Sequence, residues 1–175
     1  MLKKILAVLV VVVLGILGMA AMKPDSFAVN RSIAIKAPPE KVLALVSDFH
    51  QWRTWSPWET LDPNMQRTFS GAAAGKGAIY SWSGNKDVGS GRMEIVDLAP
   101  ASKVVIKLDF LTPMETSSVT EFVAAPQADG TLVTWNMSGP MPFISKIMSV
   151  FVSMDRMIGN DFDKGLAKMK AAAEQ

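Results

Sequence analysis

The sequence predicts an α+β protein in which an N-terminal transmembrane helix precedes one folded domain. Three observations support this class: residues 5–22 are uncharged and apolar, residues 65–139 alternate apolar with polar side chains, and residues after 142 repeat apolar side chains at steps of three and four. Alternation is typical of half-buried strands, and steps of three and four are typical of an amphipathic helix. We therefore expect an antiparallel sheet of about six to seven strands and a long C-terminal helix.

The first segment has the length of a membrane span. Lys3 and Lys4 precede an uncharged run of 18 residues from Ile5 to Met22. At about 1.5 Å per residue, a helix of this length nearly crosses a hydrocarbon core of roughly 30 Å. A cleavable signal peptide is the alternative, because Gly18 and Ala20 are small residues of the kind that precede a cleavage site. We expect an uncleaved anchor, since the run is long and rich in valine and leucine.

We therefore predict that residues 1–23 form the anchor or signal peptide and that residues 24–175 form the domain. Basic residues before the span favour a cytoplasmic N-terminus, although Lys23 just beyond the span weakens this bias. We therefore expect a single-pass protein of the inner (cytoplasmic) membrane of a bacterial-type cell, with a periplasmic or otherwise extracytoplasmic domain.

The domain is predicted to begin with one strand and two short helices. Residues 27–37 alternate apolar and polar side chains and predict the strand. Pro38 and Pro39 suit the start of the first helix. The stretch WRTWSPW at 52–58 predicts the second helix, which ends near Ser56 because the residue before a proline avoids the helical conformation.

The remaining strands and the last helix follow in order. We expect strands at 65–71, 77–85, 92–100, 103–111, 117–125 and 131–139, with a hairpin turn at Asp129-Gly130. The glycines at 89–91 lead into a strand rather than a helix, so they predict a hairpin and not a phosphate-binding loop. From Pro142 the apolar repeat predicts one helix of roughly 30 residues, with Gly159 or Gly165 as the place for a bend.

Composition excludes several function classes. The chain has no cysteine, which removes disulfides, thiolate catalysis and zinc–thiolate sites. Its single histidine, His50, excludes a metal site rich in histidine, and no carboxylate cluster has the spacing of metal ligands. We therefore expect no metal and no cofactor. Apart from Lys3 and Lys4, the basic and acidic residues are equal in number, so no electrostatic footprint for nucleic acid is expected.

Three of the five tryptophans, Trp52, Trp55 and Trp58, lie within seven positions. Their spacing along a short helix favours core packing, because base stacking would need a basic groove that Asp48 and Glu59 do not provide. His50 is expected to point to solvent, without a positioned partner for general base catalysis.

Four stretches resemble one known family. RSIAIKAPPEKVLALVSDFHQWRTWSPW at 31–58 closely resembles the opening of the polyketide cyclase/dehydrase-like branch of the START-related superfamily, also called SRPBCC or birch-pollen-allergen-like. Residues 77–85, 130–139 and 155–166 resemble further parts of the same branch. The resemblance implies a helix-grip fold, in which a curved sheet wraps around the C-terminal helix and leaves a cavity between them. Many members of this branch also carry an N-terminal membrane segment.

The resemblance and the apolar strand faces together predict a ligand cavity. The residues expected to line it are Trp58, Tyr80, Trp82, Met93, Phe110, Phe122, Trp135 and Met137, with Met148, Phe151 and Met154 of the last helix. The alternative is that these side chains simply fill the core. We expect a membrane-anchored domain that binds or transports a hydrophobic small molecule or lipid, such as an isoprenoid-like compound.

Two other functions stay open. A polyketide cyclase or dehydratase-like enzyme would depend on Asp97, which shares a predicted strand face with Met93, and on Tyr80. The plainer interpretation of Asp97 is a turn residue at the end of its strand. The third possibility is an envelope interaction module that binds no small ligand. No catalytic set of serine, histidine and aspartate is indicated.

Overall fold

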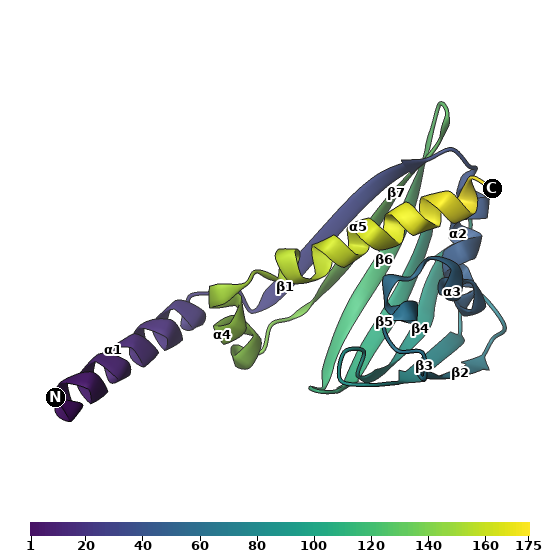
Figure 1. Ribbon diagram of the computed structural model, residues 1–175. Coiled ribbons are helices and arrows are strands. Elements are labelled where there is room, and N and C mark those ends of the chain that lie inside the picture. Colours follow the sequence, from purple (N-terminus) through teal and green to yellow (C-terminus); the bar gives the residue numbers. More distant parts are fainter.

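The computed structural model describes all 175 residues and consists of one curved sheet, a helix that crosses its inner face, and an N-terminal helix that extends away from the domain (Figure 1). The helices are α1 (Leu2–Ala21), α2 (Pro39–Ser47), α3 (Trp52–Trp55), α4 (Phe143–Phe151) and α5 (Met154–Ala173), with short 3₁₀ helices η1 (Phe49–Gln51) and η2 (Pro57–Thr60). The strands are β1 (Ser26–Ile35), β2 (Gln66–Gly71), β3 (Ala78–Ser83), β4 (Ser90–Ala99), β5 (Lys103–Thr112), β6 (Thr116–Gln127) and β7 (Gly130–Pro140).

The sheet is antiparallel throughout and has the order β1-β7-β6-β5-β4-β3-β2. Strands β2 to β6 each pair with the next strand in the chain, whereas β1 pairs with β7. The connection from β1 back to the far edge runs through α2, α3 and the 3₁₀ helices. The predicted α+β class, the antiparallel sheet and the helix-grip arrangement are confirmed.

The core lies between the inner face of the sheet and the covering helices. Trp52 and Trp55 are 3% and 0% exposed, and their indole N–H groups donate to the carbonyls of Val46 and Leu45 at 3.0 and 2.9 Å. Each ring therefore buries a large apolar area while its one polar atom keeps a partner. The tryptophan-rich stretch packs the short helices together, as its spacing predicts.

Helix α5 approaches the sheet closely at two glycines. A Cβ atom on Gly165 would lie 2.9 Å from the ring of Trp135, and one on Gly159 would collide with the guanidinium of Arg31. That guanidinium also donates to Asp155 at 2.7 Å and to Asp163 at 3.2 Å, both on α5. Glycine at these positions lets α5 lie against β1 and β7, and the ion pairs fix its rotation.

The predicted long C-terminal helix is confirmed as α5, but the prediction that it begins near Pro142 and runs for roughly 30 residues is wrong, because residues 143–151 form the separate helix α4. Val152 is extended, with φ −137° and ψ 122°, and Ser153 begins α5 by accepting a hydrogen bond from the N–H of Arg156 at 3.2 Å. A serine at this position stabilises a helix start and favours a break before it. Gly159 and Gly165 lie inside α5 and serve close packing rather than a bend.

Helix α1 fits a membrane span by length and composition. It has 20 residues and a mean hydropathy of 2.7, and Ala20 is its only buried residue. These properties are shared by membrane anchors and signal sequences. The rest of α1 makes little contact with the domain, so packing within this chain does not account for its apolar surface.

Candidate functional site: an apolar cavity with one polar end

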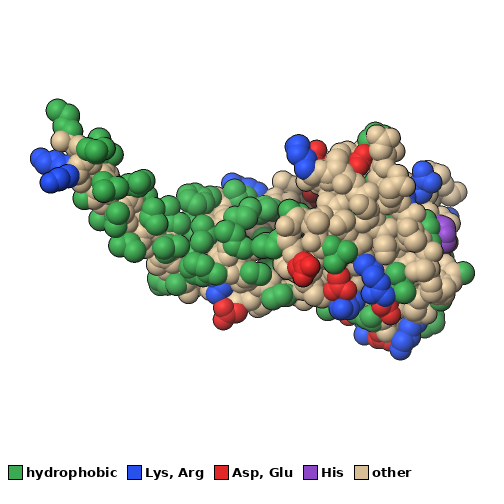
Figure 2. All heavy atoms as spheres, turned by 90° about the horizontal axis from the view of Figure 1, so that it is seen from below, with side chains coloured by type: hydrophobic (Ala, Val, Ile, Leu, Met, Phe, Trp, Pro, Cys, Tyr) green, Lys and Arg blue, Asp and Glu red, His purple; other side chains and the backbone are tan.

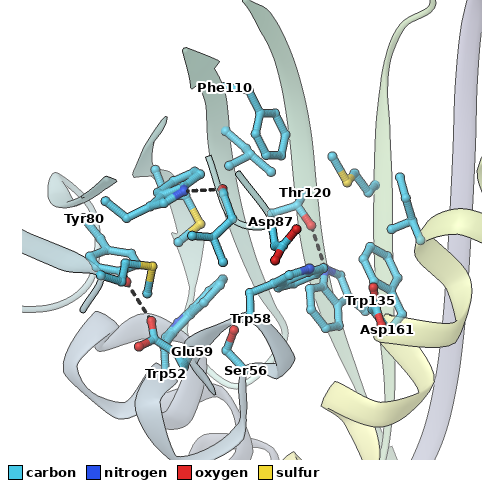
Figure 3. Close-up of a pocket in the computed structure, with 18 of the residues that line it drawn as sticks. Trp52, Ser56, Trp58, Glu59, Tyr80, Asp87, Phe110, Thr120, Trp135 and Asp161 are labelled. Carbon is cyan, nitrogen blue, oxygen red and sulfur yellow. Dashed lines mark hydrogen bonds between the residues drawn. The ribbon is translucent and has the colours of Figure 1, made fainter. Parts of the chain in front are cut away.

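A cavity of about 290 Å³ lies between the inner face of the sheet, η2 and the first turns of α5 (Figure 3). Nineteen residues line it, and fourteen of them are hydrophobic. Ligand pockets commonly measure about 300 to 1,000 Å³ and are lined mostly by apolar and aromatic side chains. The cavity therefore has the lining of a small-molecule site and lies at the low end of the usual size range.

The alternation along the strands brings the lining side chains to one face. Tyr80 and Trp82 are two residues apart on β3, and Leu108 and Phe110 are two apart on β5, so all four point inward. Of the cavity residues predicted from the sequence, the structure places seven around this space: Trp58, Tyr80, Trp82, Met93, Phe110, Trp135 and Met137.

Four residues predicted to line the cavity lie elsewhere. Phe122 is fully buried behind the wall, packed edge-on against Trp55. Met154 packs against the edge of the core at the start of α5. Met148 and Phe151 are 52% and 67% exposed on α4. The break before Ser153 takes α4 out of line with α5, so the apolar stripe that continues through the sequence does not continue along one helix face.

Asp97, which the enzyme hypothesis needed to point inward, faces outward, in line with the plainer interpretation of this residue. The register between β4 and β5 shifts between Ile95 and Asp97, which is a β-bulge. The extra residue reverses the alternation, so Leu98 packs against the core and the Asp97 side chain is 54% exposed. Asp97 instead pairs with Lys103 at 3.3 Å on the outer surface.

One end of the cavity carries a buried polar cluster that the sequence analysis missed. The Tyr80 hydroxyl donates to Glu59 Oε1 at 2.7 Å, and Arg67 Nε donates to Glu59 Oε2 at 2.7 Å. The side chains of Glu59 and Arg67 are 6% and 16% exposed. A buried carboxylate and guanidinium stabilise the fold only as a pair, because removal of either partner leaves an uncompensated charge.

This cluster changes the acidity of its members. Burial, and then the hydrogen bond to the Glu59 carboxylate, raise the pKa of Tyr80 well above its ordinary value. Burial alone would lower the pKa of Arg67, but its bond and charge interaction with Glu59 outweigh burial and raise that pKa. Tyr80 therefore remains a hydrogen-bond donor at neutral pH and does not act as a base. The alternation along β2 and β3 could have placed Arg67 and Tyr80 on the same face of this hairpin. No pattern in the sequence places Glu59 beside them.

Of the other polar groups of the lining, Thr120 is already bonded, Asp87 and Asp161 lie at the rim, and Ser56 is a buried residue whose hydroxyl makes no hydrogen bond within the protein. Thr120 accepts from the Trp135 indole N–H at 2.7 Å and donates to the carbonyl of Asn136 at 3.0 Å. Asp87 and Asp161 have side chains 58% and 34% exposed and pair with neighbouring lysines. Together with Met157, which is 44% exposed, they mark the mouth of the cavity.

The imidazole of His50 lies outside this site. Its side chain is 56% exposed, its Nδ1 lies 2.9 Å from Asp48 Oδ1, and its ring stacks on Phe69. The ring faces solvent, as expected, and does not line the cavity. It is therefore not placed to take a proton from a ligand bound there. The structure contains no group of three or more histidine, cysteine or acidic residues that could hold a metal ion.

Comparison with known proteins gives one family match and many structural matches. The model of a family described as polyketide cyclase/dehydrase and lipid transport matches residues 26–174. No curated protein matches the chain. The solved structures with the same fold include the di-domain ARO/CYC StfQ from the steffimycin biosynthetic pathway, with a TM-score of 0.65 and 13% identity over 85% of this chain and 51% of StfQ.

Two further structures are similar. The di-domain ARO/CYC BexL from the BE-7585A biosynthetic pathway has a TM-score of 0.63 and 16% identity over 90% of this chain and 53% of BexL. The Aha1 dimer from Colwellia psychrerythraea has a TM-score of 0.57 and 20% identity over 85% of this chain and 96% of that one. The chain thus matches about half the length of each di-domain protein, and these low identities show a shared fold alone.

The buried cluster predicts the titration of the only tyrosine in the chain. Because the pKa of Tyr80 is raised in the folded state, its interactions stabilise the fold fully below the unfolded pKa of about 10 and are lost as the pH rises beyond it. Phenolate absorbance near 295 nm is therefore expected to appear at a distinctly higher pH in the folded protein than in denaturant. Half-titration near pH 10, with circular dichroism still native, would contradict the burial and bonding of this hydroxyl.

Proposed function

Because the chain belongs to the polyketide cyclase/dehydrase and lipid transport family, we propose that it binds a hydrophobic small molecule or lipid in the cavity behind Trp58. The observation that carries the proposal is the cavity itself. Protein cores are close-packed, and voids larger than a water molecule are few in each domain. An open, mostly apolar space of about 290 Å³ is better explained as room for a ligand than as a packing defect.

The lining indicates the kind of ligand. Met65, Met93, Met137 and Met157 all contact the space, and unbranched methionine side chains adapt to irregular apolar shapes. The single polar end is the Glu59 carboxylate, which has lone pairs beyond those used by Tyr80 and Arg67. The ligand that fits has a long apolar body, as in a lipid or isoprenoid-like compound, and one hydroxyl or amine that donates to Glu59.

Binding is favoured over catalysis by the way in which the polar groups are engaged. Asp97 lies on the outer surface, so an enzyme of the cyclase or dehydratase type keeps only Tyr80 of the two residues that the sequence offered. The Tyr80 hydroxyl donates a hydrogen bond to Glu59 and stays protonated, and the Arg67 guanidinium balances the charge of that carboxylate. An interaction module without a ligand would not need the open space.

We also propose that α1 anchors the domain in an inner membrane, with the domain on the extracytoplasmic side. Lys3 and Lys4 before the span support this orientation. A periplasmic reporter fused after Gln175 is expected to be active, whereas the same fusion lacking residues 1–23 is expected to be silent. A silent full-length fusion with normal expression would contradict the orientation.

Filling the cavity tests the binding site. Leu108→Trp places a bulky ring in the space, so the apparent Kd for a long-chain fluorescent fatty alcohol, which carries the hydroxyl donor that Glu59 can accept, is expected to rise about tenfold or more, which is at least 1.4 kcal/mol. The matched control is Leu111→Trp on the same strand, where the side chain is 52% exposed and outside the cavity. Fluorescence titration in mild detergent measures both variants, and circular dichroism checks that both fold. Equal binding by both variants, or no binding by the wild type, would contradict the proposed binding site.

A further inference from the structure

Helix α4 has its polarity reversed relative to an ordinary surface helix. Its apolar side chains point away from the domain: Phe143, Ile144, Met148 and Phe151 are 50%, 51%, 52% and 67% exposed. Its polar side chains face the protein, since Lys146 and Ser149 are each only 8% exposed. A surface helix normally buries its apolar stripe and exposes its polar residues. The reversed pattern indicates that an apolar environment covers the outward face of α4.

The outward face carries no charge that would oppose contact with hydrocarbon. Between Met141 and Met154 the only charged residue is Lys146, and its ammonium donates to Asp25 just before β1. Ser149 donates its hydroxyl to the carbonyl of Lys146 at 2.8 Å, within the same helix. The buried polar side chains of α4, Lys146 and Ser149, therefore have partners, with the Asp25 carboxylate of the ion pair exposed at the surface, whereas the exposed side chains of α4 are mainly apolar.

The position of α4 identifies what covers this face. The last turn of α1 packs against α4, and Ala20 there is fully buried. Figure 2 shows apolar side chains that continue from α1 onto the adjoining edge of the domain. With α1 in a bilayer, α4 lies where the chain leaves the hydrocarbon, which is the level that interfacial amphipathic helices occupy. One apolar phase then covers both helices.

We propose that α4 docks on the membrane as an interfacial helix and inserts its outward face among the acyl chains. The proposal rests on the proposed function for the membrane location of α1. It also brings the cavity mouth toward the bilayer, because only two residues separate α4 from α5 and Met157 in the first turn of α5 lines that mouth.

The absence of cysteine from the chain allows a direct test in full-length protein. Met148→Cys and Phe151→Cys are each labelled with an environment-sensitive fluorophore and reconstituted into phosphatidylcholine/phosphatidylglycerol vesicles that contain nitroxide lipids. Leu9→Cys in the middle of α1 is the membrane control, and Asp129→Cys in the β6–β7 turn is the solvent control. We expect blue-shifted emission and quenching by shallow nitroxides at 148 and 151, quenching by deep nitroxides at 9, and no quenching at 129.

The controls separate this proposal from the anchoring role of α1 and from the binding of a ligand. Quenching at 9 together with water-like emission and no quenching at 148 and 151 would overturn docking by α4 while leaving the anchor intact. Blue-shifted but unquenched labels at 148 and 151 would also overturn it, because a second protein surface would then cover the face. The binding of the fluorescent fatty alcohol by unlabelled protein reports on the cavity independently.

Discussion

The contact between Trp135 of β7 and Phe162 of α5 holds the two layers of this fold together. The rings stack with centroids 4.0 Å apart and planes 5° from parallel, and Phe122 stacks on Trp135 at 4.7 Å. Aromatic pairs of this kind contribute about 0.5 to 1.5 kcal/mol beyond the area that they bury. The Trp135 indole is held in place by Thr120, and Gly165 gives α5 the room to come this close.

The cavity follows from where this contact lies. Helix α5 is held over β1 and β7 by the aromatic stack and by the Arg31 ion pairs, so the inner face of β3, β4 and β5 is covered by the short helices and only by the edge of α5. Trp58 and Trp135 meet edge to face at 5.7 Å and form one wall of the space. The bonded cluster of Glu59, Tyr80 and Arg67 closes the far end, and the Glu59 carboxylate keeps lone pairs that can accept from a ligand.

Much of the fold could be predicted from the sequence because its periodic patterns are regular. Alternation located every strand, and it brought Tyr80, Trp82 and Phe110 to the inner face. The predictions fail where a single residue interrupts the periodic pattern of apolar side chains. The bulge after Ile95 turned Asp97 outward, and the break at Val152 separated α4 from α5 although apolar residues continue at helical spacing. The position of Glu59 depends on how η2 crosses the β2–β3 hairpin, which no local pattern contains.

We propose that the space between α5 and the sheet holds a hydrophobic ligand. Native mass spectrometry of the full-length protein, extracted from bacterial membranes and released from detergent micelles, tests it most directly. We expect a second species, heavier by the mass of one lipid or other hydrophobic molecule, that disappears in Leu108→Trp and persists in Leu111→Trp. Only the bare chain, both as isolated and after incubation with a long-chain fatty alcohol, would contradict it.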